Sequence, residues 1–179
     1  MAAETLFTTS GNPFHLLDIS LSDLDTLRMQ LTKQRPEAVI RLLRGLTSLD
    51  SQNFFNHMAT AFHFPHYFGA NWPALKDSLG EQRRHHATPH LLIISHASRL
   101  LANEPRQVFE NLLDVLATIQ QEWQNPHPDE SVPPLSFKYL FQEHASGFPD
   151  LQQRFGRIRY GVDWWRWDGQ TLHLETPQA

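Results

Sequence analysis

The chain has 179 residues, of which 40% are hydrophobic and 19% are charged, and this composition excludes an intrinsically disordered protein. The absence of cysteine excludes a disulfide framework and any catalytic or metal site that depends on a thiolate. A formal net charge of −4 at pH 7 argues against a dedicated nucleic-acid-binding protein.

The sequence pattern shows neither a secretion signal nor a membrane span. Residues 1–9 lack a basic region followed by an apolar run, which a signal peptide would need. Apolar stretches stay well short of the roughly 20 residues with which a helix crosses a bilayer. We therefore expect a cytoplasmic protein that makes no contact with membranes.

Strand and helix patterns alternate in the first third of the chain. Residues 14–19 predict a short strand, and Ser22 is expected to cap a helix that ends at Pro36. Residues 38–43 form a compact apolar run that predicts a central strand. Aromatic and apolar side chains then recur at helical spacing over residues 54–62.

The alternation continues after residue 90. Residues 91–95 predict a buried strand, and Asn103 is expected to cap a long amphipathic helix that reaches Trp123. Residues 135–141 predict a further strand. Strands separated by helices imply right-handed crossovers, so the predicted fold class is α/β with a mainly parallel sheet.

Residues 64–79 contain an unusual number of residues that restrict the backbone, and these lie just before one short helix. Pro65 favours a loop, and Gly69 allows a turn or a close approach of another chain. Asn71 is a good N-cap, and Pro73 falls in the first turn, where its missing N–H costs nothing.

The short helix is predicted to have one buried and one exposed side. Leu75 and Leu79 point inward together with small neighbours, whereas Asp77 and Glu81 are expected to face solvent. The aromatic lead-in and the exposed acids together indicate a displayed surface.

This segment resembles the signature of the barstar family, intracellular protein inhibitors of barnase-type ribonucleases. The signature has a Pro, then Tyr, an aromatic residue, Gly, any residue, Asn, any residue, Asp-Ala-Leu, any residue and Asp-Cys-Leu. Two positions depart from it, because Pro73 replaces the first Asp and Ser78 replaces the Cys. The matching residues are Pro65, Tyr67, Phe68, Gly69, Asn71, Ala74, Leu75, Asp77 and Leu79.

The resemblance is close over residues 64–79 and extends by element order over residues 38–142. It implies a barstar-like domain with a three-stranded, mainly parallel sheet backed by helices. Residues 1–37 would add an N-terminal βα extension that packs on this core. Residues 143–179 would form a tryptophan-rich C-terminal tail outside the family pattern.

The resemblance also implies a function. Acids on this helix of the family enter the basic cleft of a bacterial ribonuclease and take the places of substrate phosphates, so the active site is blocked. Asp77 matches the family's second acid, while Tyr67 and Gly69 match the rim of the contact. Glu81 stands four residues after Asp77 and supplies a second charge on that face. The implied partner is a basic ribonuclease or a related toxin-like protein.

An acid on the family's long helix also contacts the enzyme. Asp114 is the nearest candidate in this chain, although a solvated carboxylate is the better interpretation of it.

The tail has a pattern of its own. Residues 164–174 predict a β-hairpin with an Asp-Gly turn, in which Trp165 and Trp167 share one face and Trp164 the other. This supports an alternative function, a non-inhibitory interaction scaffold whose tail is the binding surface. Nucleic-acid binding by Arg154, Arg157, Arg159 and Arg166 is less favoured than a hairpin that covers the sheet.

Metal binding and catalysis are both disfavoured. The histidines gather in two groups without the spacing that places two imidazoles on one helical face. There is no glycine-rich phosphate loop, nucleophile motif or paired-acid motif, so we expect neither an enzyme nor a cofactor or metal site. The two groups are His57, His63 and His66, and His85, His86 and His90.

Overall fold

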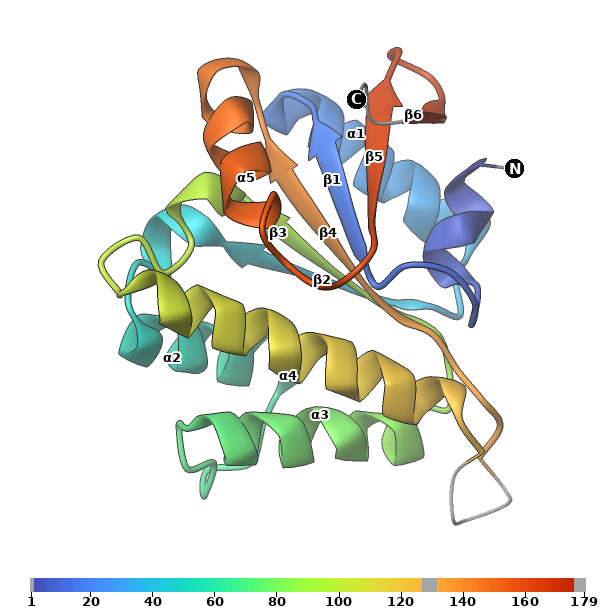
Figure 1. The fold of residues 1–179 in the computed structure, drawn as a ribbon. Helices are drawn as coiled ribbons and strands as arrows, with labels where there is room; N and C mark the ends of the chain where they lie inside the picture. Colours follow the sequence, from blue (N-terminus) through green and yellow to red (C-terminus); the bar gives the residue numbers. More distant parts are fainter. Residues whose placement is uncertain (1, 127–131, 176–179) are drawn as a thin grey trace.

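The computed structural model of the chain describes residues 2–126 and 132–175. Within them lies one six-stranded sheet with the strand order β2-β3-β4-β1-β5-β6 (Figure 1). The first five strands in this order run parallel, and β6 is antiparallel to β5. The strands are β1 (Phe14–Asp18), β2 (Val39–Arg44), β3 (His90–Ser95), β4 (Phe137–Glu143), β5 (Val162–Trp167) and β6 (Leu172–Glu175).

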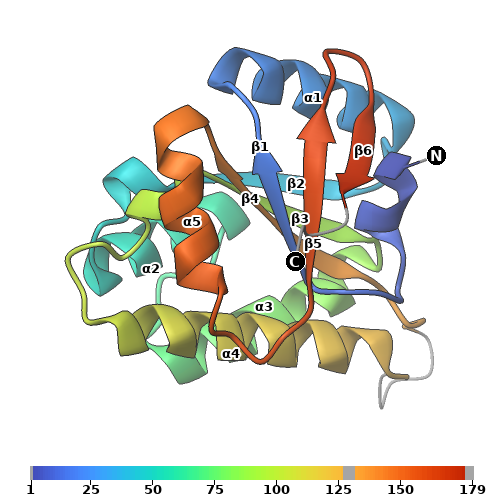
Figure 2. The same ribbon diagram turned by 45° about the horizontal axis from the view of Figure 1, so that its top comes forward.

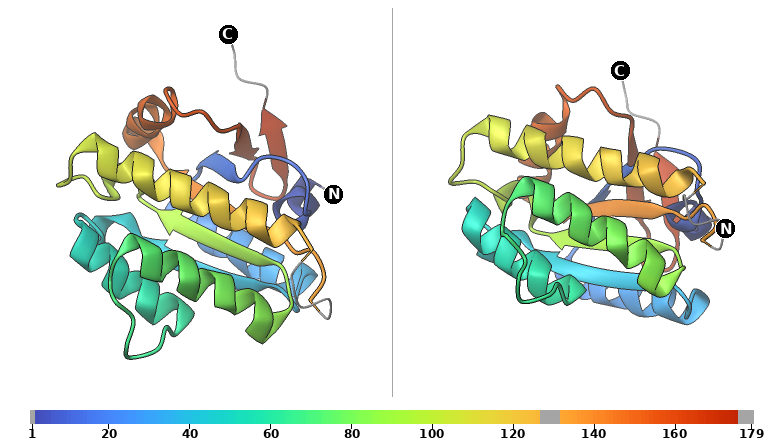
Figure 3. Two further views of the ribbon diagram at one scale, coloured as in Figure 1. Left: turned by 60° about the horizontal axis from the view of Figure 1, so that its bottom comes forward. Right: turned by 90° about the horizontal axis from the view of Figure 1, so that it is seen from below.

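Helices cover both faces of the sheet. The helix α1 lies on one face, and α3 and α4 lie on the other (Figure 2). Figure 3 shows α3 and α4 side by side across their face of the sheet. The helices are α1 (Leu21–Gln34), α2 (Ser51–Phe62), α3 (Trp72–His86), α4 (Arg106–Gln124) and α5 (Phe148–Phe155).

Alternation along the strands divides the apolar residues between two cores. In β4, Phe137 and Tyr139 join the core beneath α2, α3, α4 and α5, whereas Leu140 joins the core beneath α1. β3 and β4 are buried at every position, because other strands flank them and helices cover both faces.

The expectation of a three-stranded sheet is wrong, because the sheet has six strands. The three strands expected from the resemblance, β2, β3 and β4, are neighbours and form one half of it. The N-terminal strand β1 inserts between β4 and β5, so the chain's first and last segments complete the sheet. β4 therefore has a hydrogen-bonded partner on each side instead of an open edge.

Residues 38–43 were expected to be a central strand, and this is also wrong. β2 has only β3 as a partner and lies at the edge of the sheet. Most of its side chains are half-buried, whereas those of β3 are fully buried. An apolar run alone does not distinguish an edge strand from an inner one.

The tail does form the predicted hairpin. β5 pairs with β6 and also with β1, so the hairpin continues the sheet. Trp165 is 2% exposed in the core beneath α1, with Trp167 packed beside it. Trp164 packs against the opposite core, as the alternation predicted.

The starts of α1 and α4 and the length of α3 differ from the prediction. The cap of α1 is Ser20, whose side chain accepts a hydrogen bond from the N–H of Asp23, and not Ser22. The N-cap position of α4 is Pro105, while the N–H of Asn103 bonds to the carbonyl of Leu49. α3 is longer than expected, because it continues through residues 81–86, which resemble a polar connection in sequence.

Candidate functional site

The loop that leads into α3 is held by aromatic packing against α2. The Phe68 ring lies 4.9 Å from Phe64 and 6.2 Å from Phe55, both measured between ring centroids. Trp72, the first residue of α3, packs edge-on against Phe55 at 4.9 Å. Tyr67 is left 75% exposed at the tip of this loop. The loop therefore presents one aromatic side chain from a rigid base.

Asn71 begins α3 in the predicted way. Its side-chain oxygen accepts a hydrogen bond of 2.9 Å from the N–H of Ala74, and its side-chain nitrogen donates one of 3.2 Å to the carbonyl of Gly69. A Cβ at Gly69 would lie 3.0 Å from that nitrogen, so the absence of a side chain suits this cap. Pro73 lies in the first turn, as expected.

Substitution of Asn71 by alanine is expected to lower the free energy of unfolding by about 1 kcal/mol, because one orphan N–H of α3 loses its acceptor. Equilibrium urea unfolding measures this. The aspartate variant is the matched control, since Asp caps helices as well as Asn and should retain most of the stability. A loss as large in the aspartate variant as in the alanine variant would contradict the capping role.

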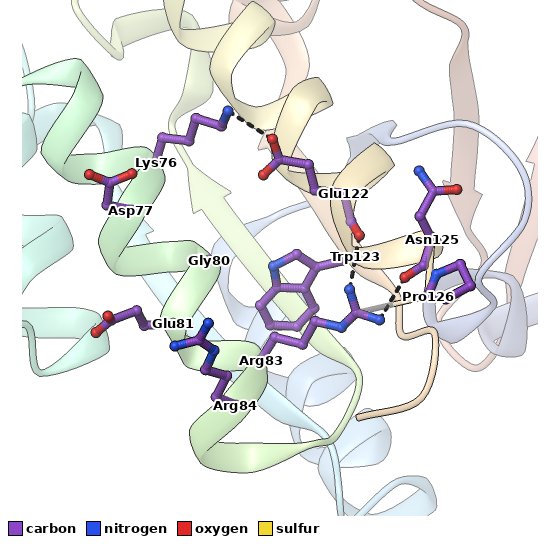
Figure 4. A pocket seen from close by; sticks show the side chains of 10 residues that line it. All are labelled: Lys76, Asp77, Gly80, Glu81, Arg83, Arg84, Glu122, Trp123, Asn125 and Pro126. Atoms are coloured by element: carbon purple, nitrogen blue, oxygen red, sulfur yellow. Dashed lines mark hydrogen bonds and ion pairs between the residues drawn. The ribbon is translucent and has the colours of Figure 1, made fainter. Parts of the chain in front are cut away.

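The exposed face of α3 carries the two predicted acids. Leu75 and Leu79 are fully buried, and they fix the helix on the core. Asp77 and Glu81 are exposed, and neither makes a hydrogen bond or ion pair with any residue in the described part of the chain. In Figure 4 both carboxylates lie on the same side of α3 and are directed away from α4.

The other flank of α3 is tied to α4. The Nζ atom of Lys76 lies 2.7 Å from a carboxylate oxygen of Glu122, and Figure 4 shows this pair spanning the gap between the helices. Arg83 is buried, and its guanidinium donates to the carbonyls of Glu122 at 2.9 Å, Asn125 at 2.7 Å and Pro133 at 2.9 Å. Burial lowers the pKa of Arg83 from its ordinary value. A positive charge at the last carbonyls of α4 also complements the helix dipole.

Replacement of Arg83 by methionine is expected to lower the free energy of unfolding by about 2–3 kcal/mol, because the variant leaves buried carbonyls without a charged donor. Thermal or urea unfolding measures this. Arg28→Met is the matched control, because its ion pair with Asp25 is exposed and is expected to be worth less than about 1 kcal/mol. Equal losses in the two variants would show that Arg83 does not hold α3 on α4.

Asp114 does not join this face. It accepts a hydrogen bond of 2.8 Å from the hydroxyl of Tyr160 and lies 3.2 Å from Arg159. The carboxylate of α4 that lies beside α3 is that of Glu122. The sequence gives a weak indication of Glu122, because this residue lies eight positions after Asp114, which is about two turns along the same helix.

The histidine groups do not form a metal site among the residues that the structure describes. His57 shares a hydrogen bond of 2.8 Å with the hydroxyl of Ser48. His90 is fully buried, and its Nδ1 lies 2.9 Å from the carbonyl of Thr88. The two groups therefore contain structural as well as exposed histidines.

Three of the four tail arginines make contacts within the protein. Arg154 donates to the carbonyls of Ala97 and Ser98 and stacks 3.8 Å from the centroid of the Phe109 ring. Arg159 pairs with Asp114, and Arg166 lies 3.0 Å from Glu175. These contacts agree with a hairpin that packs on its own domain. Across residues 2–126 and 132–175, no helix is long and apolar enough to pass through a membrane.

The sequence matches one family model, described as barstar (barnase inhibitor), over residues 38–134. This range contains β2, α2, α3, β3 and α4, and so includes the whole of the site described above. No curated protein matches the chain significantly.

Two solved structures share the fold at low sequence identity. The Aeropyrum pernix ORC2 protein in its ADP form has a TM-score of 0.61 and 8% identity, and the match covers 88% of this chain and 43% of that one. The same protein in ADPNP-ADP complexes has a TM-score of 0.57 and 11% identity, with the same coverage. This chain thus spans less than half the length of those proteins. In this chain the connection between β1 and α1 consists of Ile19 and Ser20 alone, and neither of these residues is glycine.

Proposed function

Because the chain belongs to the barstar family, we propose that it binds a small basic ribonuclease and blocks that enzyme's active site. The observation that carries this proposal is the position of Asp77. Its carboxylate is exposed on a helix fixed by Leu75 and Leu79, and no described residue neutralises it. A partner can therefore reach the charge without first breaking an internal ion pair.

The chemistry of such a contact follows from what a ribonuclease must offer its substrate. A site that binds the phosphates of RNA presents arginine and lysine side chains in a partly desolvated cleft. A rigidly held carboxylate meets these cations with charge-assisted hydrogen bonds. We propose that Asp77 enters the cleft, while Tyr67 packs on its rim and the backbone of Gly69 comes close.

A further acid supports this role for α3. Glu81 lies one turn after Asp77, and its carboxylate is on the same side of the helix. Glu122 of α4 lies on the other flank of α3, where it is paired with Lys76. Pro73 stands where the family has its first acid, so the contact at that turn would be one of packing and not of charge. The protein would act by occlusion, without a cofactor and without catalysis of its own.

The alternative function, a scaffold that binds through its tryptophan-rich tail, has less support. Trp165 is buried, and Trp164 and Trp167 pack against the two cores. The tail tryptophans thus contribute mainly to the sheet, and little of their surface is left for a partner.

Titration of a purified basic barnase-type ribonuclease into the protein, followed by calorimetry, tests the proposal. We expect one-to-one binding that weakens as salt is raised, because exposed charges are screened within about 10 Å at 0.1 M ionic strength. Binding that is insensitive to salt, or no binding, would count against the phosphate-mimic contact.

A further inference from the structure

A hollow of about 340 Å³ opens to solvent beyond the carboxyl end of β3, between α5 and the start of α4 (Figure 2). Its walls come from these two helices, from the short 3-10 helix η3 (Ala97–Arg99) and from the segment that follows η3. None of the residues that we assign to the ribonuclease contact lines it. Ligands of open α/β sheets bind outside the carboxyl ends of the strands, so the hollow lies where a binding site is favoured.

Arg154 of α5 is fixed at the edge of this hollow. Its Nη1 donates to the carbonyls of Ala97 and Ser98 at 3.1 and 3.0 Å, and its Cζ lies 3.8 Å from the centroid of the Phe109 ring. The other two nitrogens, Nε and Nη2, make no hydrogen bond with a described residue and remain open to solvent. Together they form a pair of parallel donors, which is the geometry that binds both oxygens of a carboxylate.

No acid among the described residues forms an ion pair with Arg154. Glu104, which lines the hollow, accepts a hydrogen bond of 2.8 Å from the N–H of Ser51, and Glu110 lies 2.7 Å from Arg106. Burial and the nearby charge of Arg106 lower the pKa of Arg154 to about 10, so the side chain stays charged at pH 7. Charges that are removed from water are normally paired, so this half-buried guanidinium has an unused capacity for an anion.

We propose that this hollow binds a carboxylate attached to an apolar group. The carboxylate accepts two charge-assisted hydrogen bonds from Nε and Nη2 of Arg154. The apolar group packs against the wall that Leu101, Ala102 and Phe109 form. The lining contains two arginines and one glutamate, a formal charge of +1, which a carboxylate balances and a dianionic phosphate exceeds. The site does not rest on the proposed ribonuclease contact, and its test needs no ribonuclease.

The carboxylate can come from a free organic acid or from the C-terminal residue of another protein. Binding is measured by the shift of the Arg154 Nε–H signal in ¹H–¹⁵N spectra of the full chain, assigned by its loss in Arg154→Lys. The probes are phenylacetate for a free acid and acetyl-alanyl-phenylalanine for a C-terminal residue. The controls are phenylacetamide, the dipeptide with an amidated C-terminus, and inorganic phosphate.

We expect saturable shifts with at least one carboxylate probe, and at least about tenfold weaker binding of the matching amide and of phosphate. Preference between the two carboxylates assigns the source. Equal binding of an amide or of phosphate, or no shift with any probe, would overturn the proposal.

A variant that fills the hollow gives a second test. Ala102 is exposed in the lining, so Ala102→Trp is expected to fold and to weaken carboxylate binding at least about tenfold. The matched control is Gln153→Trp, which adds the same bulk to an exposed position of α5 outside the hollow and should leave the affinity unchanged. Unchanged affinity in Ala102→Trp, or equal losses in the two variants, would also overturn the proposal.

Discussion

Substitution of Asp77 by asparagine is expected to weaken binding of a basic ribonuclease by roughly 30- to 5,000-fold, which corresponds to about 2–5 kcal/mol. The substitution keeps the size and polarity of the side chain but removes its charge. A cation in the enzyme's cleft is then left desolvated without an anionic partner, and this penalty makes the effect large. Calorimetry or surface binding with the same ribonuclease measures the loss.

The matched control is Asp150→Asn, which removes one exposed carboxylate from α5, outside the proposed contact face. It changes the net charge by the same amount and should alter the affinity less than about threefold, through long-range attraction alone. Similar losses in both variants would mean that only overall charge matters. An unchanged affinity in the Asp77 variant would remove α3 from the contact.

Between pH 7 and pH 5 the free energy of unfolding is expected to fall by about 3–4 kcal/mol. His15 and His90 are fully buried, and burial lowers their pKa values to about 3 and about 4, from an ordinary 6.5. The unfolded chain takes up protons at both positions as the pH falls through 6.5, whereas the folded protein does not. The stabilisation that comes from keeping these two histidines neutral is thus present above pH 6.5 and is lost as the pH falls below it. Urea unfolding at several pH values gives the slope.

One contact of His15 fits its neutral form, because the indole N–H of Trp165 donates to Nδ1 of His15 over 3.0 Å. A carboxylate oxygen of Asp163 lies 3.4 Å from the same nitrogen and favours the protonated form, but burial is the largest influence on the pKa of His15 and lowers it. Lys138, whose own pKa is lowered to about 8 by burial, adds a positive charge nearby. His90→Asn should remove about half of the pH dependence. A slope unchanged in this variant would show that His90 is not the group that titrates.

Much of the α3 site could be predicted because its signals are local. The capping role of Asn71, the place of Pro73 in the first turn and the burial of Leu75 and Leu79 each depend on neighbours within one or two turns. The exposure of Asp77 follows from the same periodicity. Short-range geometry fixes which side of a helix a residue occupies.

Contacts between distant segments could not be predicted in this way. Arg83 bonds to carbonyls 39 to 50 residues away, and a pattern of adjacent charges gives no sign of such partners. The sheet is a second example, because β1 pairs with β4 and β5, which lie far along the chain. The family resemblance supplied the order of β2, β3 and β4 but not the strands that complete the sheet.

The central claim is that α3 blocks a ribonuclease by occupying the site that holds the RNA backbone. The most direct test measures cleavage of a short RNA by a basic barnase-type ribonuclease at increasing protein and RNA concentrations. We predict stoichiometric inhibition that excess RNA relieves, with the apparent KM raised and kcat unchanged. Binding of the protein without inhibition, or inhibition that lowers kcat at saturating RNA, would contradict the claim.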